Sequence, residues 1–495
     1  MNNSRIKRTA FVIAAVFAGN AFAVDIAPRV SALAAQEGSA DAIIVFDDGP
    51  LPDIDPSLDY HARRRAVVDA LRARAAAHQH DMRAWLDAQG VAHEDLWIVD
   101  AIHARLTPAH LSALAARSEP MHVEENPEVL RALPPSQPNE TDTSDIGWGV
   151  AKINAPSVWS AGFTGQGVVI GGEDTGYQWD HPILKPHYRG WNGVTANHNF
   201  NWYDAVHNAR SGNPCGSSSR VPCDDDQHGT HTAGTFVGDD GPNASPRHQY
   251  GVAPGAQWIG CRNMDEGTGT PMRYMQCMQF MLAPTDLDGQ NANADVGADI
   301  VSNSWSCPSS EGCSANTLQT AVDALVAAGV FYVAAAQNSG PSCATILDPP
   351  ALYDAAFVVG ATDGLDELAS FSSLGPVVSS AKIRPDVVAP GVSICSSIPP
   401  NSYSCGFSGT SMATPHVAGA AALLMSAFPR LKGHPADVAA VLQNTAARQG
   451  VADAYNTSCG GIPQTTFPNY ILGYGRINVY AAFSSLDIFD DGFEN

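Results

Sequence analysis

Basic residues are scarce in this chain of 495 residues. Lysine and arginine together number 27, against 50 aspartates and glutamates, which gives a formal net charge of −23 at pH 7. Binding to phosphate groups needs a basic surface, so we expect no nucleic-acid partner. Charged residues of both signs make up only 16% of the chain, and apolar residues make up 44%. This balance excludes a solvated, disordered chain and is sufficient for a large buried core.

Cysteine is absent from the first 214 residues, and ten cysteines follow between Cys215 and Cys459. An even number confined to one region indicates disulfide bonds formed in an oxidising compartment. Zinc binding is the alternative interpretation. No two cysteines have the C-x-x-C spacing that many zinc sites use, which argues against it.

Long apolar runs are also missing. Three basic residues precede the short apolar run Ala10–Gly19, and the cleavage pattern Ala21-Phe22-Ala23 follows it. This order predicts a signal peptide over residues 1–23. A membrane anchor is the alternative, but the run is too short to span a bilayer. We therefore expect a secreted protein, extracellular or periplasmic, without a membrane anchor.

The chain after residue 23 begins with the pattern of a small α+β unit over residues 42–129. Thr107 and Pro108 have the residue types of an N-cap and a first-turn proline, which mark the start of its second helix. Expected strands cover 42–46, 96–106 and 121–129, and expected helices cover 62–88 and 108–117. Prolines and small polar residues over 132–147 predict a linker, which closes a first region of 24–138.

The composition changes after the linker, where short apolar runs alternate with helical stretches. The runs lie at 168–170, 300–301, 330–334 and 357–359. Fully buried parallel strands have this pattern, so we expect an α/β fold with a doubly wound, mostly parallel sheet over 139–485. Residues 486–495 form an acidic, aromatic tail for which we infer no role.

Three segments contain residue types that carry chemistry. Asp174 follows the apolar run 168–170, and parallel sheets place active sites at the carboxyl ends of their strands. An aspartate that merely starts a turn is the alternative. His228 starts the segment His-Gly-Thr-His-Thr-Ala-Gly, where it suits a general base. A structural histidine, or a metal site with His231, is the alternative, although the zinc pattern H-E-x-x-H is absent.

Ser411 lies in the third segment, Gly-Thr-Ser-Met-Ala-Thr-Pro-His-Val-Ala-Gly, which leads into an apolar helix expected over 417–428. Unpaired backbone N–H groups at a helix start stabilise developing negative charge. A plain N-cap serine is the alternative. His416 could also be proposed as a base, but we expect it to face away.

Together these segments give an acid, a base and a nucleophile in the order Asp, His, Ser, and the chain resembles the subtilisin-like serine peptidases (subtilases). The resemblance covers about residues 146–484 and rests on the long strings that begin at His228 and Gly409. Residues 42–129 resemble the inhibitory propeptide of that family. Segments at 261–265, 303–306 and 348–350 are most similar to its bacillopeptidase F-type branch.

The resemblance implies a role for each matched residue. Ser411 would be the nucleophile, His228 the base that takes its proton, and Asp174 the residue that holds the tautomer of His228. Asn338 would donate its amide to the oxyanion, although an asparagine before Gly340 can also be a plain turn residue.

The segment Asn303-Ser304-Trp305-Ser306 matches the edge that pairs with the substrate backbone, so Ser304, Trp305 and Ser306 are expected to bind substrate. Trp305 as a core residue is the alternative. Gln337 is expected at the border of the S1 pocket, where the family usually has glycine, and Ser306 also replaces a usual glycine. Both changes could narrow that pocket. Glu173 departs from the pattern as well, and we expect it at an edge of the sheet, pointing away from Asp174.

Two acidic loops, Asp224-Asp225-Asp226 and the one containing Asp286, Asp288 and Asp295, are candidates for a structural calcium ion, with a solvated loop as the alternative. We predict no metal or cofactor in the chemistry itself. For the cysteines we favour the local pairs Cys215–Cys223, Cys307–Cys313 and Cys395–Cys405, and Cys261–Cys277 and Cys343–Cys459 would follow by elimination. The sequence cannot prove this connectivity.

The predicted function is a secreted serine endopeptidase that cleaves proteins or peptides and is made as an autoprocessed precursor, cut near residues 130–145. We expect a monomer with its own propeptide as intramolecular inhibitor. A non-catalytic binding protein on the same scaffold is one rival, but such proteins generally lack a triad member. A lipase or esterase is the other, but it would need a G-x-S-x-G elbow, which Ser411 lacks.

Overall fold

The computed structural model describes residues 24–46, 49, 51, 53–55, 57–131, 145–455 and 457–490. The expected signal peptide, residues 1–23, lies outside these described residues, as do residues 132–144 of the expected linker and cleavage region and the end of the tail, 491–495. In the part of the chain that is described, no helix is both long and apolar enough to cross a bilayer.

A seven-stranded sheet of order β15-β14-β13-β12-β7-β9-β8 is the centre of the larger unit, and every neighbouring pair in it is parallel. Its strands are β7 (Val169–Asp174), β8 (Trp202–Asp204), β9 (Gln257–Arg262), β12 (Ile300–Asn303), β13 (Phe331–Ala335), β14 (Phe357–Thr362) and β15 (Val387–Pro390). The prediction of an α/β fold with a doubly wound, mostly parallel sheet is confirmed.

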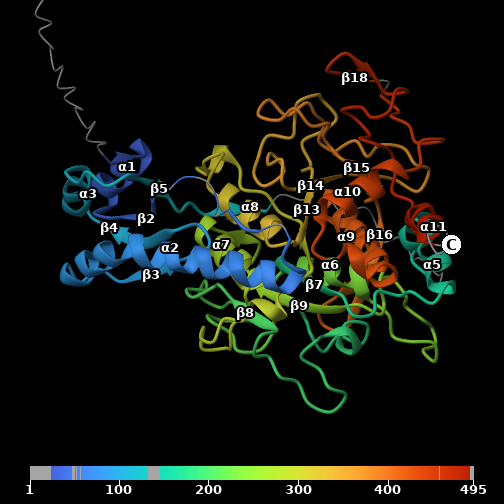
Figure 1. Cartoon of the computed structure of the whole chain (residues 1–495), viewed down its shortest axis with the longest axis horizontal. Coiled ribbons are helices and arrows are strands. Elements are labelled where there is room, and N and C mark those ends of the chain that lie inside the picture. Colours follow the sequence, from blue (N-terminus) through green and yellow to red (C-terminus); the bar gives the residue numbers. More distant parts are fainter. Residues whose placement is uncertain are drawn as a thin grey trace, which may run out of the picture.

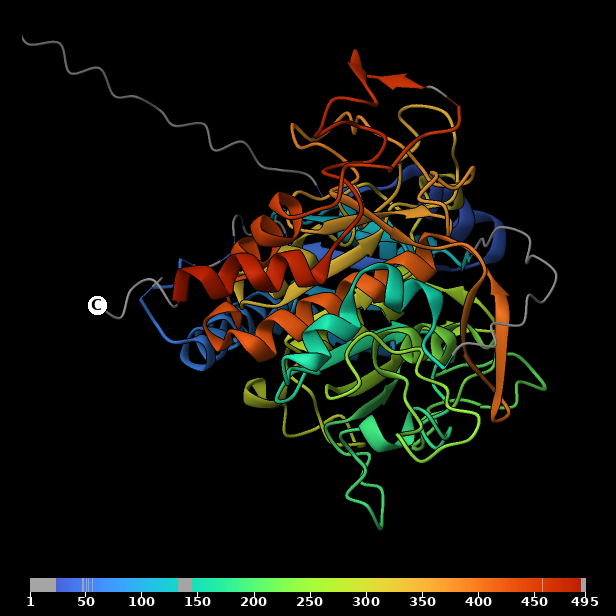
Figure 2. The same cartoon turned by 90° about the vertical axis from the view of Figure 1, so that its right-hand side faces the viewer.

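Helices cover both faces of this sheet. Helices α7 and α8 lie between the sheet and the N-terminal unit, and α6 and α9 lie on the opposite side (Figure 1). Helix α11 packs against α5 and α9 (Figures 1 and 2). The helices are α4 (Trp148–Lys152), α5 (Ala155–Ser160), α6 (His228–Val237), α7 (Pro271–Leu282), α8 (Gln319–Ala327), α9 (Thr410–Ala427), α10 (Pro435–Asn444) and α11 (Val479–Asp490).

The N-terminal unit is the α+β element that the sequence predicts. Its five-stranded sheet has the order β1-β5-β2-β4-β3. Its elements are β1 (Asp25–Ile26), α1 (Pro28–Glu37), β2 (Ala40–Phe46), α2 (Tyr60–Ala88), β3 (His93–Leu96), β4 (Ala101–Leu106), α3 (Pro108–Ala115) and β5 (Met121–Glu125).

Both faces of strand β2 are buried. Ile44 packs in the core of the N-terminal unit, whereas Ile43 belongs to a cluster that includes Met275 of α7 and Leu325 of α8. Burial on both faces explains why β2 is apolar at successive positions instead of alternating. The second face of β2 is therefore part of the contact between the two units.

Short strands complete the fold. Strand β6 of the N-terminal segment joins two short strands of the larger unit in a three-stranded sheet, β10-β11-β6. These strands and the remaining hairpins are β6 (Val129–Leu130), β10 (Met264–Asp265), β11 (Thr268–Gly269), β16 (Ile394–Ile398), β17 (Ser402–Phe407), β18 (Ser458–Cys459) and β19 (Ile462–Pro463).

Several element boundaries differ from those expected. The strand expected over 96–106 is a hairpin of β3 and β4, because the chain turns at Asp100 with φ 47°. Helix α9 starts at Thr410, seven residues before the expected start, and α11 continues to Asp490 through the beginning of the expected tail. No element was expected over residues 25–37, where β1 and α1 lie.

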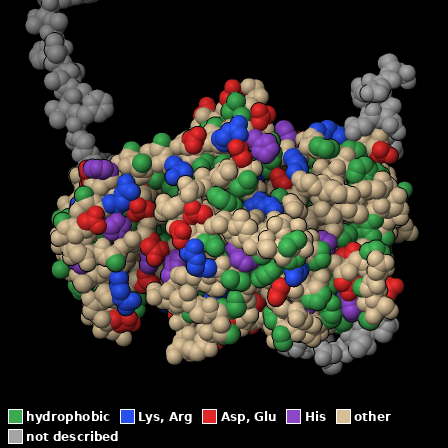
Figure 3. All heavy atoms as spheres, turned by 90° about the horizontal axis from the view of Figure 1, so that it is seen from below, with side chains coloured by type: hydrophobic (Ala, Val, Ile, Leu, Met, Phe, Trp, Pro, Cys, Tyr) green, Lys and Arg blue, Asp and Glu red, His purple; other side chains and the backbone are tan. Residues whose placement is uncertain are grey.

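All ten cysteines are paired, and the predicted connectivity is confirmed. The pairs are Cys215–Cys223, Cys261–Cys277, Cys307–Cys313, Cys343–Cys459 and Cys395–Cys405. On the face drawn in Figure 3, acidic and basic side chains are interspersed, and the described residues show no continuous basic area there.

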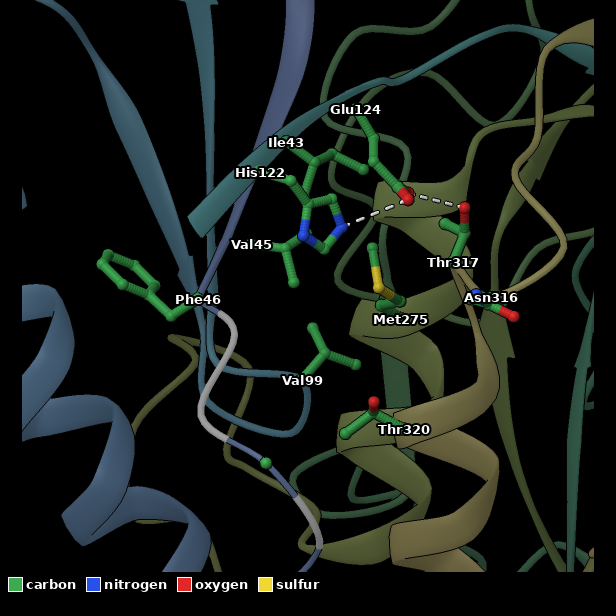
Figure 4. Close-up of a pocket in the computed structure, with 11 residues that line it drawn as sticks. Ile43, Val45, Phe46, Val99, His122, Glu124, Met275, Asn316, Thr317 and Thr320 are labelled. Carbon is green, nitrogen blue, oxygen red and sulfur yellow. Dashed lines mark hydrogen bonds and ion pairs between the residues drawn. The ribbon is translucent and has the colours of Figure 1, made fainter. Parts of the chain in front are cut away.

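A cavity of about 420 Å³ lies where the N-terminal sheet faces α7 and α8 (Figure 4). His122 and Glu124 enter it from β5, with 3.3 Å between Nε2 of His122 and Oε1 of Glu124. The hydroxyl of Thr317 donates to Oε2 of Glu124 at 2.7 Å. Glu124 thus connects the two units directly.

Candidate active site

Asp174 and His228 are joined where the interior strand β7 ends and helix α6 begins. Nδ1 of His228 lies 2.7 Å from Oδ1 of Asp174, and both side chains are buried. The backbone N–H of Thr175 also donates to Oδ1, at 2.7 Å. The carboxylate therefore has a fixed orientation at the carboxyl end of the sheet, as expected from the sequence.

Gly229 allows helix α6 to start so close to Asp174. A Cβ atom at this position would lie 2.1 Å from the backbone oxygen of Gly176 and 3.1 Å from Cβ of Asp174. A side chain would push the helix away from the strand end. The glycine after His228 is therefore required by the close approach of two backbone segments.

Asp224 stabilises the same helix start from the acidic loop. Its Oδ2 accepts from the backbone N–H of Thr230 at 2.9 Å, and its Oδ1 accepts from the hydroxyl of Thr175 at 2.9 Å. Burial raises the pKa of Asp224, while the hydrogen bond from the Thr230 side chain acts to lower it. Asp224 thus links the residues that follow Asp174 to those that follow His228.

Ser411 lies in the first turn of α9 and is buried. Its hydroxyl donates to the backbone oxygen of Ser304 at 2.9 Å. Nε2 of His228 has no hydrogen-bond partner among the described residues. Rotation of the Ser411 hydroxyl away from Ser304 is therefore needed before His228 can take its proton. Catalytic hydrogen bonds commonly tighten only when substrate is present.

Asn338 lies beside Ser411, and its orientation is fixed by the residue that precedes the serine. Its Oδ1 accepts from the backbone N–H of Thr410 at 2.9 Å and from the Thr410 hydroxyl at 3.0 Å. With the amide oxygen held in this way, the amide NH₂ points in the other direction. Asn338 and Ser411 line one pocket.

That pocket has a volume of about 120 Å³, and all of the residues expected to bind substrate line it. Gln337 closes one wall, because its amide donates to the backbone oxygen of Asp348 at 2.6 Å and accepts from the N–H of Leu347 at 3.2 Å. The lining residues are Arg131, Ser304, Trp305, Ser306, Pro308, Ala335, Gln337, Asn338, Ser339, Asp348, Thr410 and Ser411.

Trp305 reaches this pocket from a buried position. Its ring stacks on Tyr274 with 3.8 Å between centroids, and its indole N–H donates to the backbone oxygen of Glu173 at 2.9 Å. Only 4% of Trp305 is exposed. The structure therefore places Trp305 in the core as well as at the pocket wall.

The expectation for Glu173 is wrong in one respect. Strand β7 lies between β12 and β9, so Glu173 is on an interior strand of the sheet and not at an edge, and its side chain is fully buried. The hydroxyl of Tyr332 donates to its Oε1 at 3.1 Å. Burial raises the pKa of Glu173 well above its ordinary value. Glu173 thus lies next to Asp174 in the sequence, on the other face of the sheet.

The two acidic loops bind protein groups. Asp225 accepts from the buried guanidinium of Arg262 at 2.8 Å, and Asp226 pairs with Arg131. In the other loop Asp286 accepts from Asn291, Asp288 pairs with Arg220, and Asp295 pairs with Arg65. Within the described ranges no three His, Cys, Asp or Glu side chains are grouped to hold a metal ion. Calcium at these loops therefore remains a prediction.

Arg131 is a charged member of the pocket that the sequence reasoning missed. It follows strand β6, and its backbone N–H donates to the oxygen of Gly267 at 2.9 Å. The signal was a basic residue directly before the proline-rich linker. Its position depends on a pairing with residues more than 130 positions away.

Comparison with known proteins was consistent with these observations. The sequence model of the subtilase family matches residues 165–475. Bacillopeptidase F of Bacillus subtilis (strain 168) is 34% identical over 453 residues, which cover 86% of this chain but only 29% of that protein. Subtilisin DY of Bacillus licheniformis is 32% identical over 339 residues, which cover 68% of this chain and 98% of subtilisin DY.

Proposed function

The chain belongs to the subtilase family and is a serine endopeptidase, and from that premise we propose that Asp174, His228 and Ser411 form its catalytic triad. The observation that carries this proposal is the buried hydrogen bond between Asp174 and His228, at the start of the helix that packs against α9, whose first turn holds Ser411. A serine hydroxyl is a weak nucleophile unless a neighbouring base removes its proton.

In the proposed reaction, Nε2 of His228 accepts the proton of Ser411 as the serine oxygen attacks the scissile carbonyl carbon. Asp174 holds Nδ1 protonated and stabilises the imidazolium that forms. His228 then gives its proton to the leaving amine, and an acyl-enzyme remains on Ser411. Water attacks this ester with His228 again as base, which releases the acid product and restores the serine.

The tetrahedral oxyanion would be stabilised by Asn338 and by the start of α9. The amide oxygen of Asn338 accepts from two donors of Thr410, which fixes the orientation of the amide group, and Asn338 lines the same pocket as Ser411. The backbone N–H of Ser411 belongs to the first turn of the helix, where N–H groups have no partner in the helix itself. Two such donors, aimed in advance, lower the barrier without reorganisation.

We further infer that the N-terminal unit is an inhibitory propeptide and that the chain is a secreted precursor. Strand β6 pairs with β11, and Arg131 lines the pocket of Ser411, so the segment that ends at Arg131 occupies space that a substrate needs. The predicted signal peptide and the five disulfide bonds support secretion. Self-cleavage would fall between residues 131 and 145.

Intact-mass measurement of two purified precursors that lack residues 1–23 tests this proposal. One is otherwise unchanged, and the other carries Ser411→Ala. We expect the unchanged chain, incubated alone, to be cut between residues 131 and 145 and then to digest casein, and the Ser411→Ala chain to stay whole. Cleavage of both chains at one position, or neither cleavage nor casein digestion by the unchanged chain, would contradict the proposal.

A further inference from the structure

The segment 129–131 lies in the cleft as an extended strand. Leu130 pairs with Thr268 and Val129 with Gly269 in antiparallel register, and the N–H of Arg131 continues this pairing to Gly267. On its other side, the N–H of Leu130 donates to Oε2 of Glu311 at 2.8 Å. Peptides that add a strand to a sheet edge bind in this way, with the backbone fixing the register and side-chain pockets fixing the sequence.

The side chain of Arg131 is only 10% exposed in this arrangement. Its guanidinium pairs with Oδ2 of Asp226, and its Nε and Nη1 atoms are buried without a hydrogen-bond partner among the described residues. A buried charge that loses its partner is strongly unfavourable. Asp226 is thus the group that makes an arginine acceptable at this position.

Gly267 makes room for the pair. A Cβ atom there would lie 2.7 Å from Oδ2 of Asp226 and 3.9 Å from Nε of Arg131. Because φ of Gly267 is +78°, the position also favours glycine over other residues. The absence of a side chain leaves a space bounded by the β11 backbone and a carboxylate.

Of the three neighbouring aspartates, Asp226 is the one that faces this space. The carboxylate of Asp224 accepts hydrogen bonds from the hydroxyls of Thr175 and Thr230, and that of Asp225 forms an ion pair with Arg262. These partners belong to the catalytic unit and stay in place when the N-terminal segment leaves. Departure of Arg131 would leave Asp226, 30% exposed even in the complex, beside the cleft without its cation.

We propose that Asp226 selects substrates that carry arginine or lysine at the residue pairing with Gly267, and that Arg131 occupies this subsite in the precursor. The inference rests on the proposed function, since it assigns a substrate class to the same cleft. An ion pair that is largely removed from water favours a cation over a neutral side chain by roughly tenfold to a hundredfold in kcat/KM. Peptides with arginine should be cleaved with a higher kcat/KM than peptides with lysine, because the observed contact uses Nη2 of Arg131, at the end of the longer of the two side chains.

The test uses internally quenched peptides with the chain's own sequence from Glu128 to Pro135. In this series position 131 is Arg, Lys, Gln or Glu, and the cut position is read by mass spectrometry. A further peptide carries Gln at 128, because the pair of Glu128 with Arg210 is exposed and should contribute little. The enzymes are the full precursor without residues 1–23, allowed to process itself, and its Asp226→Asn, Asp226→Arg and Asp288→Asn variants.

Casein digestion by each enzyme is measured first. In the unchanged enzyme we expect the Arg peptide to exceed the Gln peptide by at least about tenfold in kcat/KM. In Asp226→Asn the ratio of kcat/KM for the Arg peptide to that for the Gln peptide should fall below about threefold. In Asp226→Arg the Glu peptide should be cleaved with a higher kcat/KM than the Arg peptide. The ratio of the Arg peptide to the Gln peptide should be unchanged in Asp288→Asn, which removes a similar charge from an exposed pair with Arg220. Ratios within one enzyme cancel any general effect of Asp226 on nearby His228.

Equal cleavage of the Arg and Gln peptides by an enzyme that digests casein would overturn this inference and leave the proposed function intact. A preference that persists in Asp226→Asn would also overturn it, since another group would then recognise the cation. Failure of the unchanged enzyme to digest casein would overturn the proposed function, and with it the inference.

Discussion

Ser304 and Ser411 exchange two hydrogen bonds. The hydroxyl of Ser411 donates to the backbone oxygen of Ser304 at 2.9 Å, and the hydroxyl of Ser304 donates to the backbone oxygen of Ser411 at 3.0 Å. Pro415 lies four residues after Ser411 inside α9 and has no N–H for that oxygen. The hydroxyl of Ser304 therefore replaces the helical donor that the proline removes.

Ser304→Ala should lower the free energy of unfolding by about 1–3 kcal/mol, because the buried oxygen of Ser411 would lose its donor. Urea unfolding in a Ser411→Ala background, where self-cleavage is prevented, measures this. Ser302→Ala is the matched control: Ser302 lies in the same segment, and its buried hydroxyl has no partner among the described residues. Equal losses of unfolding free energy in both variants would show that the hydrogen bond from Ser304 to the backbone of Ser411 does not stabilise the protein.

Asn338→Ala should lower kcat by about 10²–10³-fold with little change in KM, because the lost amide would act only on the transition state. Steady-state kinetics on a peptide substrate measures both constants. Thr410→Val keeps the backbone donor to Asn338 and removes only the hydroxyl, so its loss should be far smaller. A raised KM at unchanged kcat for Asn338→Ala would instead indicate ground-state binding.

Local patterns in the sequence were sufficient for the fold and for most of the candidate site. The buried strands are short apolar runs, and the segments around His228 and Ser411 are specific enough to indicate a family. Helix α9 begins at Thr410 and not at 417 as predicted, and it continues through Pro415 because the hydroxyl of Ser304 supplies the donor that the proline lacks.

Two features could not be predicted because they depend on long-range topology. The sequence predicts an edge position for Glu173, and only the order of the strands shows that β7 is an interior strand. Arg131 belongs to the site through pairing of β6 with β11, which are far apart in the sequence. No periodicity within a single segment contains either relationship.

Glu173→Gln should stabilise the protein at neutral pH relative to the unchanged chain. Burial raises the pKa of Glu173 well above its ordinary value of 4.5, so above that pH this group binds more protons in the folded chain than in the unfolded chain. Stability attributed to this group therefore falls as pH rises, by up to about 1.4 kcal/mol per pH unit, until the raised pKa is passed. Glutamine can still accept from Tyr332 and does not titrate.

Urea unfolding at a series of pH values, again with Ser411→Ala, measures the difference between the two chains. The advantage of Glu173→Gln should be small near pH 4 and should grow toward pH 8. Glu367→Gln, a change at an exposed residue, should show no such growth. An advantage independent of pH would mean that Glu173 does not change its protonation in this range.

Acid should weaken the hold of the N-terminal unit on the catalytic unit through Glu124. Burial acts to raise the pKa of Glu124, but hydrogen bonds from His122 and Thr317 outweigh it and lower the pKa below its ordinary value of 4.5. The contribution of this carboxylate is therefore complete above pH 4.5 and is lost as pH falls through the lowered pKa. Thr317→Val should weaken the self-cleaved complex by about 1 kcal/mol near pH 6 and make its acid dependence shallower.

Size-exclusion chromatography of that complex from about pH 6 to about pH 3.5 measures the fraction that keeps its N-terminal unit. Thr320→Val alters the same cavity away from the Glu124 carboxylate (Figure 4) and should leave both the affinity and its pH dependence unchanged. If Thr317→Val and Thr320→Val behaved alike, the contact at 2.7 Å would not be what makes the interface sensitive to acid.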